Sequence, residues 1–397
     1  MQRAFRRRQA RGQAPGQQGP EPKRKTRPDG RSDDSMSEIR ACRLDDIPAV
    51  ADMFQRTFRD AREPAPPALH RALRELFFEH PWQDPELPSR VSEADGKVNG
   101  FIGTLPVRMA FRGRKLRAAV PSSLMVDDPH KHPLAGAKLI RAFLNGPQDL
   151  SFSEPISPLA QSMWERLGGE AVPSESMEWL RVLRPAGLAL AFAAGRMPIL
   201  GIAHPVARMI DRGLARRGHF ATTPLAASFH DADVDDATLF AVISEVAESY
   251  ALHPAWDAGV LSWQLAHAAG NATRGALRRR AVFDRSGDAV GCYVYHGRPG
   301  QMAWTLLVLA RPQTVEPVLD SLFAHAAGAA AAAVKGRTQL RLLDPLLKRN
   351  AVFFRRHSAA VHSRDRELLA AIRTGDAVTS GLAAESWSRL IGDSFRQ

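Results

Sequence analysis

The apolar positions of the chain become periodic from about residue 38 onward. Residues 38–43 (EIRACR) are typical of a short strand. Residues 46–60 predict a helix that Asp45 or Asp46 can cap, because their apolar side chains recur at helical spacing. These side chains are Ile47, Val50, Ala51, Phe54 and Phe58. Residues 68–80 (ALHRALRELFFEH) follow two prolines and predict a second helix.

Strands and crossover helices follow in this first half. Residues 89–107 predict a hairpin whose turn is Asp95-Gly96. The order is completed by a strand over 117–126, a helix from Pro133, a strand over 149–155, a helix over 157–169 and strand-like residues 169–183. Because a helix joins the 117–126 and 149–155 strands, the pattern favours parallel pairing between them. The first half is therefore predicted to be a mixed α/β domain.

The second half repeats this order in outline. A helix over 235–253 precedes a hairpin over 278–297, and a strand over 301–310 follows. Residues 312–333 then predict a helix that includes the alanine run Ala326–Ala333, and residues 338–344 (TQLRLLD) predict a strand. We interpret the halves as two copies of one architecture. The predicted divisions are a tail over 1–36, a domain over 37–182, a helical linker over 183–225 and a domain over 226–397.

Length, charge and cysteine content narrow the class of protein. A chain of 397 residues exceeds one ordinary core and favours two domains. Residues 1–35 hold ten Lys/Arg and four Asp/Glu, which is half of the net charge of +12. Their Arg-, Gln-, Gly- and Pro-rich composition predicts disorder, with a nucleic-acid or anionic-membrane arm as the alternative. Two distant cysteines, Cys42 and Cys292, favour a reducing, cytoplasmic compartment and provide no metal quartet.

One apolar stretch raises the question of membrane contact. Residues 186–203 are nearly long enough to span a bilayer, but Arg196 and Pro198 interrupt them and a basic segment follows. We interpret them as part of an inter-domain helix pair. Peripheral contact with a membrane is the alternative, because an apolar face beside arginines can lie in the lipid interface.

The main candidate site lies where the chain passes from a predicted strand to a predicted helix, at residues 124–144 (LMVDDPHKHPLAGAKLIRAFL). The start of a helix presents unpaired backbone N–H groups that suit a phosphate, and small residues let a diphosphate approach them. His130, Lys131 and His132 add cations or hydrogen-bond donors there. The alternatives are a plain solvated connection and a metal site at the two histidines, but no further ligand cluster completes a metal site.

Three segments in this order resemble the GNAT superfamily of acyl-CoA-dependent N-acyltransferases: residues 39–54, 126–139 (VDDPHKHPLAGAKL) and 157–169 (SPLAQSMWERLGG). The resemblance implies two GNAT-like domains in tandem, each a twisted mixed sheet flanked by helices. It also implies acetyl-CoA or another acyl-CoA as co-substrate and no metal. The family's coenzyme A pattern, Gln or Arg, two residues, Gly, one residue, then Gly or Ala, falls here on His132, Ala135 and Ala137. The implied binding residues are Leu124, Met125, Val126, His132, Leu134, Ala135, Gly136, Ala137 and Lys138.

The resemblance also suggests how acyl transfer would proceed. Pantetheine would lie between two splayed strands, with the backbone around 124–126 polarising the thioester carbonyl. Glu93 and Glu154 are candidate bases at predicted strand ends. The position of the family's thiolate-protonating tyrosine holds Trp164, so Ser157 or Ser162 is the candidate donor through water, with a helix cap or a surface residue as the alternative for each.

The function predicted is N-acyl transfer, in the simplest case N-acetyl transfer, from acyl-CoA to a small-molecule or polymer amine. A catalytically degenerate GNAT-like scaffold, or an aminoacyl or long-chain acyl transferase of the same fold, is the alternative. No nucleic-acid-binding motif is present, so we do not expect nucleic acid as a partner.

Overall fold

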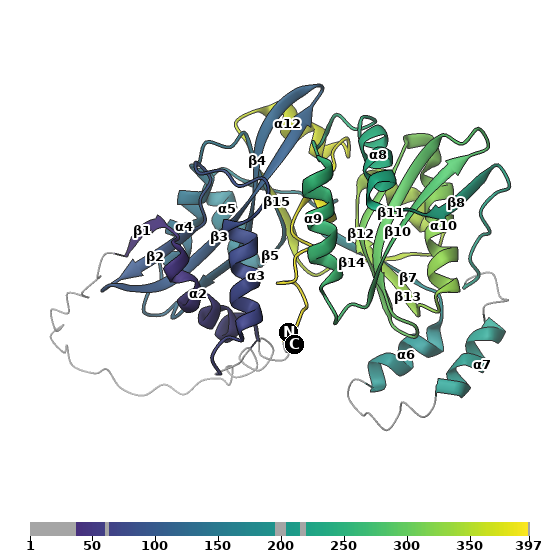
Figure 1. Cartoon of the computed structure of the whole chain (residues 1–397), viewed down its shortest axis with the longest axis horizontal. Coiled ribbons are helices and arrows are strands. Elements are labelled where there is room, and N and C mark those ends of the chain that lie inside the picture. The colour runs from purple at the N-terminus through teal and green to yellow at the C-terminus, as the bar shows by residue number, and fades with distance from the viewer. Residues whose placement is uncertain (1–36, 60–62, 195–203, 215–219, 396–397) are drawn as a thin grey trace, which may run out of the picture.

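The computed structural model describes residues 37–59, 63–194, 204–214 and 220–395. Two mixed sheets with flanking helices lie side by side (Figure 1), which confirms the predicted mixed α/β class. The tail over residues 1–36, with its interpretation as a nucleic-acid or membrane arm, lies outside the described residues.

The first sheet has eight strands in the order β1-β2-β3-β4-β5-β15-β6, with β9 paired to β3. Their bounds are β1 Glu38–Ala41, β2 Arg90–Ala94, β3 Lys97–Phe111, β4 Arg114–Val126, β5 Leu150–Ile156, β6 Glu170–Ala171, β9 Leu252–Pro254 and β15 Ser358–His362. The β2–β3 turn uses Asp95 and Gly96 at φ 52° and 71°, as the sequence predicts for this hairpin.

Helices cover both faces of this sheet. They are α2 (Ile47–Phe54), continued by a π-helical turn over Gln55–Arg59, α3 (Pro67–Phe78), α4 (Ala135–Leu144) and α5 (Pro158–Arg166). Successive residues of a strand point to opposite faces. Phe101 of β3 accordingly meets Phe77 of α3, with ring centroids 5.3 Å apart. A side chain at Gly100 would point the other way, because its Cβ would lie 3.0 Å from Leu139 of α4. The α4 helix and the α3 helix therefore lie on opposite faces.

The second sheet has seven strands in the order β14-β7-β13-β12-β11-β10-β8. Their bounds are β7 Met177–Val182, β8 Phe229–Asp233, β10 Ala276–Asp284, β11 Ala289–Gly297, β12 Met302–Ala310, β13 Ala333–Arg337 and β14 Val352–Arg355. The accompanying helices are α8 Asp236–Ala247, α9 Ala258–Ala269, α10 Val315–Gly328 and α11 Leu343–Lys348. Helix α12 (Arg366–Arg373) follows in sequence but lies against the first sheet, where Arg373 forms an ion pair with Glu170 of β6. Two further helices, α6 (Pro185–Ala194) and α7 (His204–Leu214), connect β7 to this half.

The halves exchange strands. The β7 strand follows the first half in sequence but pairs with β13 and β14 of the second sheet. In return, β15 from the second half pairs with β5 and β6 of the first sheet. The predicted first domain was placed at 37–182, whereas the first sheet holds residues of both halves. Each sheet is complete only when the other half of the chain is folded.

Two local predictions in the second half are wrong. The alanine run does not continue the helix: α10 ends at Gly328, Ala330 has a φ of 63°, and Ala333 begins β13. Residues 338–344, predicted as a strand, form a short helical turn that leads into α11. Burial and strand pairing override the helix propensity of alanine here: Ala331–Ala333 are at most 2 % exposed, and Ala333 pairs with Met302 and Val182.

The segment after α12 ties the halves together. Its Ala377 forms a β-bridge with Leu252, and Trp387 is 2 % exposed. The indole of Trp387 packs edge-on against Trp263 of α9 at 5.4 Å and near His80 of the first half at 6.1 Å. One hydrophobic core consequently runs through both halves and this segment.

Candidate active site

The strands β4 and β5 separate near the end of β4, where the sequence predicts the connection from this strand to the next helix. They pair in parallel only at Ala118–Leu150 and Ala119–Ser151 among the described residues. On its other side, β4 carries a bulge: Ser123 and Leu124 oppose the single residue Ile102, and Ser123 has a φ of 54°. A bulge bends the strand that contains it and often lies beside an active site. The carboxyl ends of β4 and β5 therefore diverge.

Helix α4 follows the end of β4, and backbone N–H groups in its first turn lack hydrogen-bond partners among the described residues. It starts at Ala135, two residues after the predicted Pro133, because residues 128–134 form turns. The Asp128 carboxylate accepts hydrogen bonds from the amides of His130 and Lys131, and these bonds lower its pKa. Among the described residues, no hydrogen bond uses the amides of Gly136 and Ala137. These amides are the donors that a helix start offers to an anion.

The predicted binding residues divide into three groups by position. Met125 and Ala135 are buried in the core, at 2 % and 1 % exposed, and Gly136 is buried too, so only the backbone of these three residues can face a ligand. Half-buried side chains that surround the start of α4 belong to Leu124, Val126, His132, Ala137 and Lys138. Leu134 is 57 % exposed. A Cβ at Gly136 would meet Val126 and Met163 only at ordinary contact distances, 3.6 and 3.9 Å, so small residues leave room there.

Two of the predicted catalytic residues lie away from the strand divergence. Glu93 is on β2, which β3 and β4 separate from β5, and it forms an ion pair with Arg40 at 2.6 Å. Ser162 is on the exposed side of α5 and donates its hydroxyl hydrogen bond to the Pro158 carbonyl at 3.1 Å. Trp164, at the tyrosine position of the resemblance, is 2 % exposed and packs near Phe143 in the core. None of these three side chains faces the opening between β4 and β5.

Glu154 does lie at the divergence, on β5, and it is 2 % exposed. Its Oε1 accepts hydrogen bonds from the Gly381 amide at 2.7 Å and the Ser386 hydroxyl at 2.9 Å. Its Oε2 lies 3.3 Å from Nε of Arg337 and has no hydrogen-bond partner. Glu154 is thus held by groups that come from the distant C-terminal segment.

Glu154 belongs to a buried cluster of ionisable side chains between the two sheets. Lys335 pairs with Glu178 at 2.7 Å, and Arg337 lies between Glu154 and Glu178. Two further carboxyls are present: burial raises the pKa of Glu175 to about 7 and that of Glu385 to about 8. At a pH below these two values both carboxyls are protonated, and the two cations, Lys335 and Arg337, are then matched by the two carboxylates with which they form ion pairs, Glu178 and Glu154.

Glu385 is the member of this cluster that touches β4. Its raised pKa is opposed in part by a side-chain hydrogen bond with Ser122 of β4, and the nearby Glu154 raises it further. Ser122 directly precedes the bulge residue Ser123. A carboxyl that keeps its proton near pH 7 can act as an acid at this place.

The sequence alone gave no signal for Glu175, Arg337 or Glu385. Gly381, which fixes Glu154, lies 227 residues away from it in sequence. The segment that carries Gly381 and Glu385 has no motif, and its position depends on the strand exchange and on Trp387. Only knowledge of long-range contacts would have indicated these residues.

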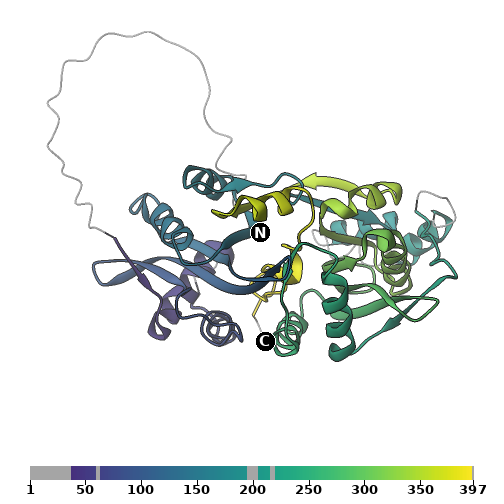
Figure 2. The ribbon, with the colours of Figure 1, turned by 90° about the horizontal axis from the view of Figure 1, so that it is seen from above.

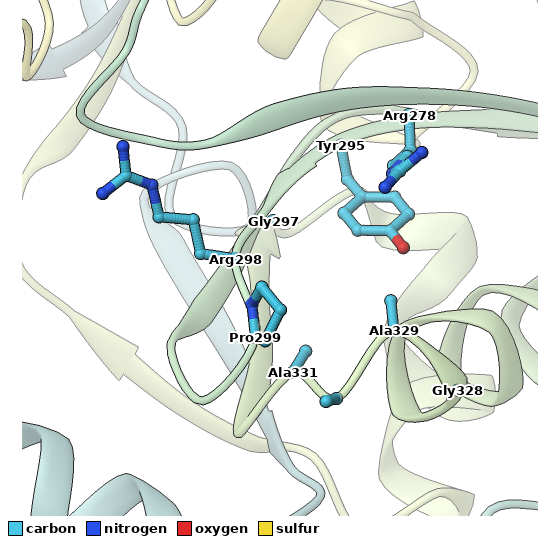
Figure 3. A pocket seen from close by; sticks show the side chains of 9 residues that line it. Arg278, Tyr295, Gly297, Arg298, Pro299, Gly328, Ala329 and Ala331 are labelled. Carbon is cyan, nitrogen blue, oxygen red and sulfur yellow. The ribbon is translucent and has the colours of Figure 1, made fainter.

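A cavity of about 340 Å³ lies in the second half, between the ends of β10 and β11 and the α10–β13 connection (Figure 3). Tyr295 and Arg278, which are cross-strand partners, lie at one end, and Pro299, Ala329 and Ala331 line the other. Arg278 is the first of three successive arginines on β10, Arg278–Arg280. Arg279 and Arg280 form ion pairs with carboxylates of the same half. Only Arg278 of the three lines the cavity.

Comparison with known proteins gives a likeness in structure only. No protein-family model matches the sequence, and no curated protein matches it. A protein of Enterococcus faecalis described as a probable N-acyltransferase matches with a TM-score of 0.55 at 11% identity, over 83% of this chain and 73% of that one. A GCN5-related N-acetyltransferase of Anabaena variabilis matches with a TM-score of 0.54 at 10% identity, over 83% of this chain and 73% of that one.

A third solved structure, a GCN5-related N-acetyltransferase of Kribbella flavida, matches with a TM-score of 0.50 at 13% identity, over 82% of this chain and 72% of that one. Each of these likenesses extends over both sheets rather than one half. Together with the divergent β4 and β5, they show that the chain has the fold of the GNAT superfamily, the GCN5-related N-acetyltransferases.

Proposed function

We propose that the first half binds an acyl-CoA and transfers its acyl group to an amine acceptor. One observation carries this proposal: β4 and β5 diverge beside the start of α4, where the backbone amides have no hydrogen-bond partner among the described residues. The diphosphate of the co-substrate would rest on the amides of Gly136 and Ala137. Its pantetheine would extend between the two strands, beside the bulge at Ser123.

Glu385 is the proton donor in this proposal. The amine nitrogen attacks the thioester carbonyl, the C–S bond breaks, and the departing thiolate takes the Glu385 proton. The proton that the new amide releases restores Glu385, so one proton passes from nitrogen to sulfur in each turnover. A donor of pKa about 8 is close to the ordinary thiol pKa of about 8.5. This role replaces the one that the buried Trp164 cannot perform.

Titration calorimetry with acetyl-CoA tests the binding step. Gly136→Glu places a carboxylate where the diphosphate would lie, and we expect binding to be lost. Gly328→Glu is the control for a carboxylate added to a helix, at an exposed glycine where a Cβ meets nothing within 4 Å. Because Gly136 is buried, an unchanged circular dichroism spectrum must show that Gly136→Glu still folds. Equal affinities in the two variants would refute the assignment of the diphosphate site.

Release of free thiol in the presence of panels of amines tests the transfer step. Turnover should fall as the pH rises above about 8, where Glu385 loses its proton. Glu385→Gln should lower kcat at least about a hundredfold and leave the affinity for acyl-CoA unchanged. A variant with normal kcat would remove Glu385 from the mechanism.

A second candidate is an acyl-CoA-binding protein without transferase activity. The observation that favours it is the contact of Gly381 and Ser386 with Glu154, because these groups fill the inner end of the divergence between β4 and β5. Acyl-CoA binding without thiol release, across acetyl, aminoacyl and long-chain donors, would support this candidate over the first.

A further inference from the structure

The helices α6 and α7 form a hairpin that lies apart from both sheets. Figure 1 shows the pair, in teal, below the second sheet. The hairpin is fixed by defined contacts: the Asp211 carboxylate of α7 accepts hydrogen bonds from the amides of Ala186 and Gly187 at the start of α6, at 2.8 and 2.9 Å. Arg184 joins the hairpin to the second half through the Ala327 carbonyl at 2.9 Å. The faces of these two helices are therefore set by the fold.

Helix α7 is amphipathic, but its apolar side faces outward. Ala207 and Asp211, one turn apart, are buried at 7 % and 5 % exposed. The large apolar side chains on the other side are Val206, Met209 and Ile210, at 55 %, 67 % and 47 % exposed. They recur at i, i+3 and i+4, so they form one stripe along the helix. A water-facing helix normally presents its polar residues outward.

Helix α6 adds an uncharged surface to this stripe. Its sequence, PAGLALAFAA, contains no polar side chain. A helix that is apolar all round is normally buried in a core or in lipid. None of the α6 side chains that the structure describes is fully buried, and Leu188 and Leu190 remain half-exposed. The hairpin thus exposes apolar area on both of its helices.

The charge beside the stripe indicates what covers it. Arg208 and Arg212 are exposed one turn apart on α7, adjacent to Met209. Asp211 is the acidic residue of the two helices, and it is buried against α6. We propose that the α6–α7 hairpin docks on an anionic lipid bilayer, with its apolar stripe in the interface and its arginines at the lipid phosphates.

A second copy of the chain fits this surface less well. A twofold contact would place the same face of both copies together, so Arg208 and Arg212 would meet an equally basic surface. Such a contact would bring like charges together and leave them without an acidic partner on either hairpin. Lipid phosphates provide the missing negative charge, and acyl chains cover Val206, Met209 and Ile210.

Vesicle flotation of the full chain tests this docking. We expect binding to vesicles of phosphatidylcholine with phosphatidylglycerol, and little binding to phosphatidylcholine alone. Met209→Glu should weaken binding at least about tenfold, because a charge replaces the most exposed apolar side chain of the α7 stripe. Arg208→Gln with Arg212→Gln should weaken it about thirtyfold at low salt. Leu347→Glu is the matched control, since Leu347 is 53 % exposed on α11.

A fluorescent label separates the hairpin from the basic tail over residues 1–36. The two native cysteines are buried, and burial raises the pKa of each to about 12, so an introduced cysteine can be labelled selectively. A polarity-sensitive dye at Met209→Cys should shift to shorter wavelength with anionic vesicles, and one at Leu347→Cys should not. Vesicle binding without that shift, or a concentration-dependent dimer that Met209→Glu dissociates, would overturn the proposal.

Discussion

The protonated state of Glu385 can be tested through stability, independently of activity. Its carboxyl is 8 % exposed, and burial raises its pKa from an ordinary 4.5 to about 8. Between these two values the unfolded chain releases the Glu385 proton while the folded protein keeps it. Stability from this group is therefore fully present below pH 4.5 and is lost as the pH rises toward 8.

The expected size of the effect follows from the pKa difference. Each pH unit between 5 and 8 costs about 1.4 kcal/mol, so the free energy of unfolding should fall by about 4 kcal/mol from this group alone. In Glu385→Gln the side chain at position 385 keeps nearly the same shape but has no group that titrates in this pH range. Relative to the wild type, the variant should therefore gain about 4 kcal/mol of stability between pH 5 and pH 8.

Urea unfolding at both pH values measures this difference. Glu367→Gln is the control, because the Glu367 side chain is 70% exposed and forms only a solvent-exposed ion pair, with Arg112. If the wild type and Glu385→Gln lose stability in parallel as the pH rises, the carboxyl is already ionised in the folded protein. The charge balance of the cluster and the proton-donor role would then both be wrong.

Three further predictions concern the same regions. Gly381→Ala should destabilise the protein by at least about 2 kcal/mol in urea unfolding, because φ is 68° and the new Cβ would lie 1.9 Å from the Leu306 carbonyl oxygen. Burial lowers the pKa of His80 to about 4, so the folded protein should lose stability as the pH falls from 6.5 toward 4. His80→Gln should remove about 3 kcal/mol of that loss. If the free energy of unfolding of His80→Gln falls as much as that of the wild type between pH 6.5 and 4, this reasoning is wrong. Ser162→Ala should change thiol release less than twofold; a large loss would return Ser162 to the mechanism.

The sequence determined the local elements around the candidate site. The Asp95-Gly96 turn, the apolar run of β4 and the small residues of α4 depend on neighbours a few residues away, so periodicity and turn chemistry indicated them. The resemblance to the GNAT superfamily rested on the same short segments, and the structural likenesses confirm the fold. Helix α4 begins at Ala135, two residues later than predicted, because the turns that start at Asp128 extend to Leu134.

Only the tertiary structure decided which charged groups meet at the divergence of β4 and β5. Glu93 and Glu154 are the same residue type at similar strand ends, yet Glu93 is half-buried in an ion pair with Arg40 on β2, whereas Glu154 is buried between the two sheets. The alanine run after Gly328 likewise leaves the helix, forms a turn and enters β13 at Ala333, which is fully buried and paired with Met302 and Val182. Burial, ion pairing and pKa depend on residues far away in the sequence, such as Glu385 in the last described segment. Local patterns determine helices and turns, whereas the chemistry of a buried site depends on the whole folded chain.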